Sequence, residues 1–118
     1  MPIEYAYEKF RSTIHSIVTS STTDTPQDRL YSAAMGTTFL DEDDFPSDSW
    51  KQFQEFKASM TQVPDSERGS FRATADSLTD VQAHELLVMF HEIAMALEDE
   101  VQRIRIGDAV VRQAAGNL

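Results

Sequence analysis

The run TDVQAHELLVMFHEIAMALEDEVQRIRI, residues 79–106, has the strongest helical pattern in the chain. Thr79 and Gln82 have the spacing of a capping box, which predicts that a helix begins here. Neither Gly nor Pro follows until Gly107. One stripe of apolar residues recurs at helical spacing: Phe90, Ile93, Leu97, Val101 and Ile104. We therefore predict a helix over residues 80–106, about 40 Å long at roughly 1.5 Å per residue.

Two features of this run predict how the helix is placed and where it ends. Residues 86–90 are apolar on every side of the helix. A helix that is apolar all round is normally buried, so we expect other helices to surround it. Arg103 and Arg105 complement the helix dipole near its C-terminal end. We expect either that Gly107 ends the helix or that residues 108–115 add a further one.

Two more helices are predicted in the first 36 residues. An apolar stripe with alternating spacings of four and three runs along the first: Ile3, Tyr7, Phe10, Ile14 and Ile17. The Ser/Thr run at 19–23 favours side-chain bonds to the local backbone, which ends this helix. Thr25 before Pro26 is the predicted N-cap of the second helix, and Gly36 is its predicted stop.

The middle of the chain predicts a third helix and a short fourth. Ser47 or Ser49 begins the third helix, and Val63-Pro64 closes it. It carries four large apolar side chains: Trp50, Phe53, Phe56 and Met60. One or two helical turns are expected between Phe71 and Ser77.

The whole chain is expected to form one helical domain. No stretch alternates apolar and polar residues in the manner of a strand. The 118 residues are 41% hydrophobic, enough for one core over residues 1–118. We predict an all-α fold, a compact bundle of four or five helices around a long C-terminal helix.

Composition excludes several classes of function. The chain has no cysteine, which excludes disulfides and thiolate chemistry. It begins without an export signal, and no apolar run approaches the roughly 20 residues that cross a bilayer. We therefore expect a cytoplasmic protein. A net charge of −10 disfavours phosphate-rich partners, so neither nucleic acid nor membrane is expected as a partner.

The acidic residues occur in blocks that predict a basic protein partner. Between Arg29 and Lys51 the chain has no Lys or Arg. Five acids fall in that interval: Asp41, Glu42, Asp43, Asp44 and Asp48. A surface field of one sign attracts partners of the opposite sign. Four consecutive carboxylates also repel one another, so we expect folding to gain nothing from them and a cationic partner to relieve the repulsion.

Aromatic residues beside the acids favour a binding site over a loop that only keeps the protein soluble. Interfaces combine aromatic anchors with surrounding charge. We predict that Phe45 and Trp50 are such anchors. A second predicted patch consists of Glu98, Asp99 and Glu100.

Metal binding and catalysis are not expected. The pairs His84-Glu85 and His91-Glu92 lie seven residues apart. Two helical turns span about 10.5 Å, whereas helical metal ligands are spaced by three or four residues. No serine has the context of a nucleophile, and the glycines form no phosphate-binding loop. We therefore expect a non-enzymatic protein without a metal or another cofactor.

A small, acidic, cysteine-free helical chain with clustered carboxylates resembles the immunity proteins of bacterial nuclease toxins, of the colicin and contact-dependent inhibition types. The resemblance covers the whole chain in kind, without a shared motif. It implies a stoichiometric inhibitor that presents acids to a basic nuclease domain. Two alternatives are open. A homodimerising structural or regulatory module would leave a wide apolar face on the long helix, and a metal-binding bundle would turn His91 and Glu92 inward beside acids of another helix.

Overall fold

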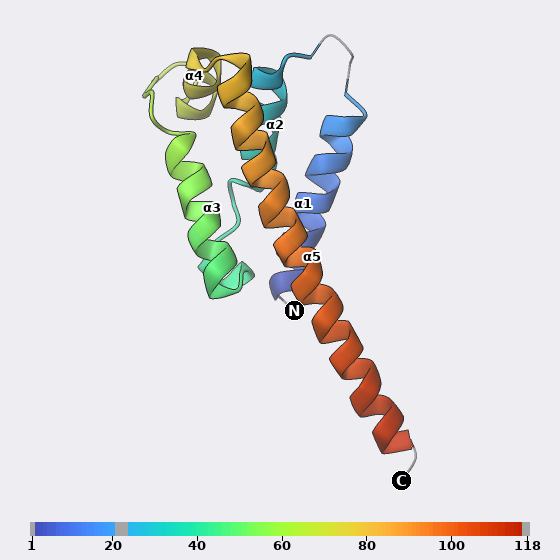
Figure 1. The fold of residues 1–118 in the computed structure, drawn as a ribbon. Helices are drawn as coiled ribbons and strands as arrows, with labels where there is room; N and C mark the ends of the chain where they lie inside the picture. Colours follow the sequence, from blue (N-terminus) through green and yellow to red (C-terminus); the bar gives the residue numbers. More distant parts are fainter. Residues whose placement is uncertain (1, 21–23, 117–118) are drawn as a thin grey trace.

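The computed structural model describes residues 2–20 and 24–116. In this part of the chain all regular structure is helical, so the predicted all-α fold is confirmed (Figure 1). The elements, in order, are α1 (Pro2–Val18), α2 (Pro26–Thr37), the 3-10 turn η1 (Glu42–Asp44), α3 (Ser47–Ser59), α4 (Ser70–Ser77) and α5 (Asp80–Gly116).

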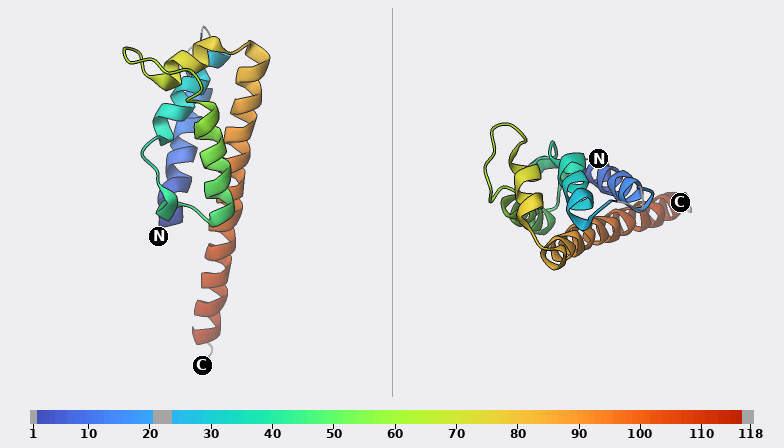
Figure 2. Two further views of the ribbon diagram at one scale, coloured as in Figure 1. Left: turned by 90° about the vertical axis from the view of Figure 1, so that its left-hand side faces the viewer. Right: turned by 90° about the horizontal axis from the view of Figure 1, so that it is seen from above.

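Helices α1, α2 and α3 pack along the first part of α5, and the short α4 covers one end of the bundle (Figures 1 and 2). The last turns of α5 extend beyond the other helices, which makes the molecule elongated, with extents of 61 × 29 × 22 Å. The bundle and the projecting end of α5 therefore have different surroundings, although one helix joins them.

Aromatic side chains from three helices form the centre of the core. The Phe10 ring of α1 stacks on Phe90 of α5 with 4.6 Å between centroids. Phe53 of α3 meets Phe10 edge-on at 5.7 Å, and Phe56 lies 5.4 Å from Phe90. All four side chains are buried. Such pairs contribute about 0.5–1.5 kcal/mol each beyond the burial of their area.

The predicted core stripe of α5 is confirmed, but two expectations about this helix are wrong. Phe90, Ile93, Leu97 and Val101 are buried and Ile104 is half-buried. Other helices do not surround α5, since Val88 in its apolar run is 42% exposed. Gly107 also does not end the helix. Residues 108–115 are helical, as the second alternative expected, but they continue the same helix to Gly116. A helical Gly costs only about 1 kcal/mol relative to Ala, so it weakens a helix without ending it.

The caps of α2 and α5 agree with the sequence. The Thr25 hydroxyl accepts a hydrogen bond from the Asp28 backbone N–H, and the Asp28 carboxylate accepts one from that of Thr25. Thr79 and Gln82 exchange the same two bonds before α5. Gly36, however, does not end α2, which continues to Thr37.

Packing explains the glycine inside α2. A Cβ atom at residue 36 would lie 2.5 Å from Thr13 Oγ1 and 2.9 Å from Thr13 Cγ2. The absent side chain therefore lets α2 approach α1 closely. Gly36 is required by a tertiary contact and not by a C-cap.

The remaining boundaries differ little from the prediction. Thr19 and Ser20 donate side-chain hydrogen bonds to the carbonyls of His15 and Ile17 just after α1, as expected of the Ser/Thr run, and residues 21–23 lie outside the described part. Helix α3 begins at Ser47 but ends at Ser59, before Val63-Pro64. The predicted turns between 71 and 77 form α4.

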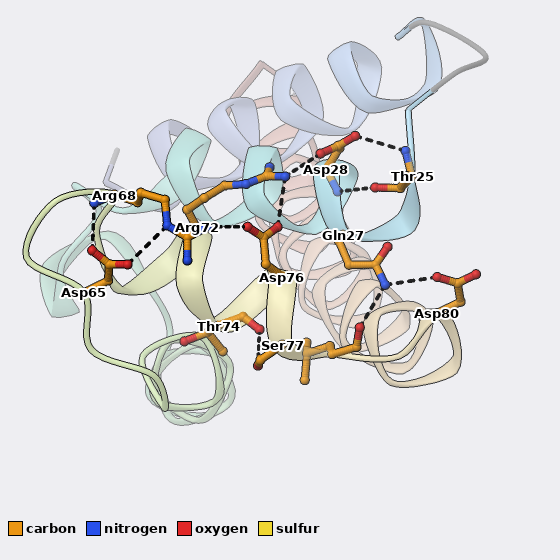
Figure 3. Close-up of polar contacts among 11 residues, drawn as sticks. Thr25, Gln27, Asp28, Asp65, Arg68, Arg72, Thr74, Asp76, Ser77 and Asp80 are labelled. Carbon is orange, nitrogen blue, oxygen red and sulfur yellow. Dashed lines mark hydrogen bonds and ion pairs between the residues drawn. The ribbon is translucent and has the colours of Figure 1, made fainter.

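A polar network holds α2, α4 and the loop before α4 together (Figure 3). The Arg72 guanidinium donates to Asp28 at 2.8 Å and pairs with Asp76 at 3.0 Å. Arg68 bonds to Asp76 at 2.8 Å and to Asp65 at 3.1 Å. The hydrogen bond from Arg72 lowers the pKa of Asp28, and the bonds from Thr25 lower it further. Backbone N–H groups, that of Arg68 first, lower the pKa of Asp65.

We expect Asp28→Asn to lower the melting temperature at pH 7, with a difference from wild type that shrinks in acid. The pKa of Asp28 lies below its ordinary 3.8 in the folded state. Its stabilisation is therefore present above about pH 3.8 and is lost as the pH falls through the lower folded pKa. Thermal melts from pH 7 to pH 2 measure this difference. Glu67→Gln is the control because its side chain makes none of these bonds. A difference that is constant with pH would contradict the prediction.

Candidate partner-binding site

The acidic segment forms a compact turn that its own carboxylates hold in place. The Asp41 carboxylate accepts a hydrogen bond from the Asp43 backbone N–H at 3.0 Å. The Asp44 carboxylate accepts one from the Asp41 backbone N–H at 2.9 Å. These bonds form a capping box around η1. The expectation that folding gains nothing from the acidic run is therefore wrong for Asp41 and Asp44, because two of the four acids satisfy backbone donors.

The other acids of the segment face solvent. Glu42 and Asp43 are exposed, and their side chains make no hydrogen bond or ion pair within the described residues. Asp48 is exposed in the first turn of α3, where the helix dipole favours a negative charge. Three carboxylates thus remain available to a partner at this end of the bundle.

Phe45 and Trp50, the predicted anchors, pack against the core. The Phe45 ring stacks on Phe53 with 4.8 Å between centroids and meets Phe10 edge-on at 6.1 Å. Trp50 lies 5.5 Å from Phe45. Both side chains are half-buried. In the unbound protein they fix the acidic turn to the bundle, and only part of each ring faces outward.

A different aromatic pair stands exposed beside the turn. Tyr5 of α1 is 46% exposed and Phe39, which follows α2, is 53% exposed. Their ring centroids are 6.3 Å apart. The Lys9 ammonium lies 5.3 Å from the centre of the Phe39 ring and 5.6 Å from that of Tyr5. Phe39 stands two residues before the acidic run in the sequence, but no local pattern pairs it with Tyr5 of α1.

We call this region the acid–aromatic surface. It combines two exposed rings, over which the Lys9 ammonium lies, with neighbouring anionic side chains. It consists of Tyr5, Phe39, Glu42, Asp43 and Asp48. Large exposed aromatic side chains supply contact area, and carboxylates beside them attract cationic groups. No group of three or more His, Asp or Glu side chains that could hold a metal ion occurs in residues 2–20 and 24–116. The arrangement suits recognition of a protein surface.

The second predicted patch does not gather on one face. Consecutive residues of an α-helix point about 100° apart, so Glu98, Asp99 and Glu100 spread around α5. Glu98 lines a hollow between α1 and α5, and Asp99 is exposed. Glu100 forms an ion pair with Arg103 one turn later.

The two histidines of α5 are exposed to solvent. His84 and His91 are exposed and line hollows between α1 and α5. Glu85 and Glu92 are also exposed. The inward-facing His91 and Glu92 that a metal-binding bundle would require are therefore not found.

No family model, curated protein or solved structure matches this chain. The resemblance to immunity proteins therefore rests on size, acidity and helical content alone. Within the described residues, no helix combines the length and apolar character that crossing a membrane requires. The acid–aromatic surface and the projecting end of α5 are the features from which function can be argued.

Proposed function

We propose that this protein is a non-enzymatic inhibitor that binds a basic protein through the acid–aromatic surface, in the manner of an immunity protein that neutralises a nuclease toxin. The observation that carries the proposal is the fixed acidic turn beside the exposed Tyr5–Phe39 pair. The capping bonds hold the turn before a partner arrives, so binding loses little loop entropy.

The proposed mechanism is occupation of a phosphate-binding groove. A nuclease domain binds its substrate with Lys and Arg side chains that neutralise phosphates. Glu42, Asp43 and Asp48 would take the positions of those phosphates, and the aromatic pair would supply apolar contact. Long-range attraction raises the association rate, whereas the desolvated rings slow dissociation.

A second candidate function, a homodimerising adaptor, is favoured by a separate observation. Val88, Met95 and Ile106 remain exposed on α5 after the core is filled. An apolar face of this kind is what such a module would leave on its long helix. Dimer formation and inhibition would use different surfaces, so the two functions are compatible.

The test of inhibition uses the protein encoded by the adjacent reading frame as the partner. Cells that express that protein alone should lose viability, and co-expression of this chain should restore growth. The purified pair should form a 1:1 complex whose association rate falls as salt rises, because ions screen charges over about 8 Å at physiological strength. A neighbouring protein that is neither toxic nor bound by this chain would contradict the proposal.

Glu42→Gln with Asp43→Asn should slow association about 3–10-fold at low salt, because both charges face solvent and steer the encounter. The cap acids Asp41 and Asp44 stay intact, so the turn should keep its shape. Stopped-flow binding kinetics at two salt concentrations measure the effect. Glu55→Gln with Glu67→Gln is the matched control, since it changes net charge equally at other exposed sites.

Equal slowing by the two pairs of substitutions would assign the effect to net charge and not to the turn.

Phe39→Ala should act differently and speed dissociation about tenfold or more if Phe39 is an interface anchor. A melting temperature close to that of wild type would show that the fold of each variant is intact.

A further inference from the structure

The projecting end of α5 is an amphipathic helix that the other helices do not cover beyond Arg105, whose guanidinium pairs with Glu4 of α1 at 3.6 Å. From Arg105 to Gly116 every side chain is exposed. Ile106, Val110 and Val111 are 64%, 60% and 68% exposed. At about 100° per residue they fall within one half of the helix circumference, whereas Asp108 and Arg112 lie on the other half.

Such a segment is poorly stable by itself. Isolated helices shorter than about 12–15 residues are marginal in water, and most helical stability in proteins comes from packing of the apolar face. Residues 106–116 have no such packing within the chain. A surface that covers the apolar half of this segment would stabilise it as a helix.

A matching surface lies on the same molecule, between α1 and α5. A hollow of about 290 Å³ there has mainly apolar walls, among them Ile14, Ile17, Leu87 and Val88. It meets a second, more polar hollow of about 420 Å³, which Arg11 and Arg105 also line and which continues along α5 past Met95 and Glu98. The two share Ile14 and His91, so together they follow α5 toward its projecting end. The projecting segment extends beyond α1, α2 and α3 (Figure 1). As one continuous helix it cannot fold back against α1 and the earlier turns of its own α5, which line these hollows.

The charges along α5 favour one relative orientation of the α5 helices of two copies. Residues 80–100 carry six acids and no Lys or Arg: Asp80, Glu85, Glu92, Glu98, Asp99 and Glu100. Residues 101–116 carry Arg103, Arg105 and Arg112 against the single acid Asp108. Arg103 pairs with Glu100 and Arg105 with Glu4 of the same chain, so Arg112 is the arginine available to a second copy. An antiparallel pair sets the basic end of each helix beside the acidic part of the other. A parallel pair sets like charges together, which is unfavourable.

We propose that two copies of this chain form an antiparallel dimer in which residues 103–116 of each α5 lie in the α1–α5 hollows of the other. Ile106 and Val110 contact the apolar walls, and Arg112, which makes no ion pair within the described residues of its own chain, lies near the acids of the opposite helix. The interface leaves the acid–aromatic surface open, because Tyr7 lines the hollow and Tyr5, which points about 200° away around α1, contacts Phe39. The dimer rests on the second candidate function, which it specifies, and it does not depend on the proposed inhibition.

Sedimentation velocity on the full chain tests the dimer. The expected mass is twice 13.3 kDa at micromolar concentration. Ile106→Asp with Val110→Asp on the projecting segment, or Val88→Asp on the hollow, should raise the dimer dissociation constant at least 100-fold. Val63→Asp with Ser66→Asp, on the exposed loop before α4, should leave it unchanged. Circular dichroism should show less helix in the monomeric variants, together with a retained thermal transition of the bundle.

A wild-type protein that stays monomeric at several hundred micromolar would overturn the proposal, as would a dimer unaffected by the changes at Ile106 and Val110. Orientation is tested with pyrene on single cysteines, which are unique because the chain has none. Mixed Gln113→Cys and Glu85→Cys proteins should give excimer emission, and Gln113→Cys alone should not. Excimer from Gln113→Cys alone would establish a parallel dimer and overturn the antiparallel arrangement.

Discussion

Phe90→Ala is expected to lower the free energy of unfolding by about 3–5 kcal/mol, the range for truncation of a buried aromatic side chain. The Phe90 ring is buried between Phe10 of α1 and Phe56 of α3. Its removal leaves a cavity where three helices meet. Domains of this size are stable by only about 5–15 kcal/mol, so a large share of the total is lost.

Urea unfolding followed by circular dichroism measures the loss. Leu97→Ala, on the same buried stripe, should cost about 2–5 kcal/mol. Gln54→Ala is the control, because Gln54 is exposed on α3 and Ala is a good helix former. A loss below about 1 kcal/mol at Phe90 is too small for a core aromatic and would show that the aromatic cluster does not form the core.

Gly36→Ala is expected to destabilise the protein by about 1–3 kcal/mol, the usual cost of overpacking. In an open helical position the same change would stabilise by up to about 1 kcal/mol, because Ala is the better helix former. At residue 36 the change lowers the free energy of unfolding instead, because the new Cβ would lie 2.5 Å from Thr13 Oγ1. Helices α1 and α2 must separate, or Thr13 must leave its buried position.

A double-mutant cycle with Thr13→Ala isolates this contact. Thr13→Ala removes the two closest atoms and leaves Cβ at 3.2 Å. The double variant should therefore be more stable than Gly36→Ala alone, with a coupling energy of about 1 kcal/mol or more. Additive effects of the two changes on the free energy of unfolding would show that the cost of Gly36→Ala does not come from its contact with Thr13.

Features that depend on residues three or four positions apart could be predicted from the sequence. The capping bonds of Thr25 and Thr79 join residues three apart, so the chain specifies them locally. The same holds for the buried stripe of α5, since helical spacing alone places Phe90 and Leu97 on one face. The acidic run at 41–44 is also visible in the sequence itself, whereas the bonds of Asp41 and Asp44 to backbone N–H groups required the structure.

Features that depend on distant residues required the tertiary structure. Residue 36 has no room for a Cβ atom because Thr13 lies against it, and the Phe45 ring packs inward because it contacts Phe10 and Phe53. The exposed pairing of Phe39 with Tyr5 has the same origin.

Some features of α5 follow from the sequence, and others required the tertiary structure. Local pattern sets where the helix begins and which face it buries, because both follow from neighbouring turns. It does not set where the helix ends, because Gly107 is only a weak local signal. Nor does it show that the apolar half of residues 106–116 faces solvent, since that depends on how far α1, α2 and α3 extend beside α5.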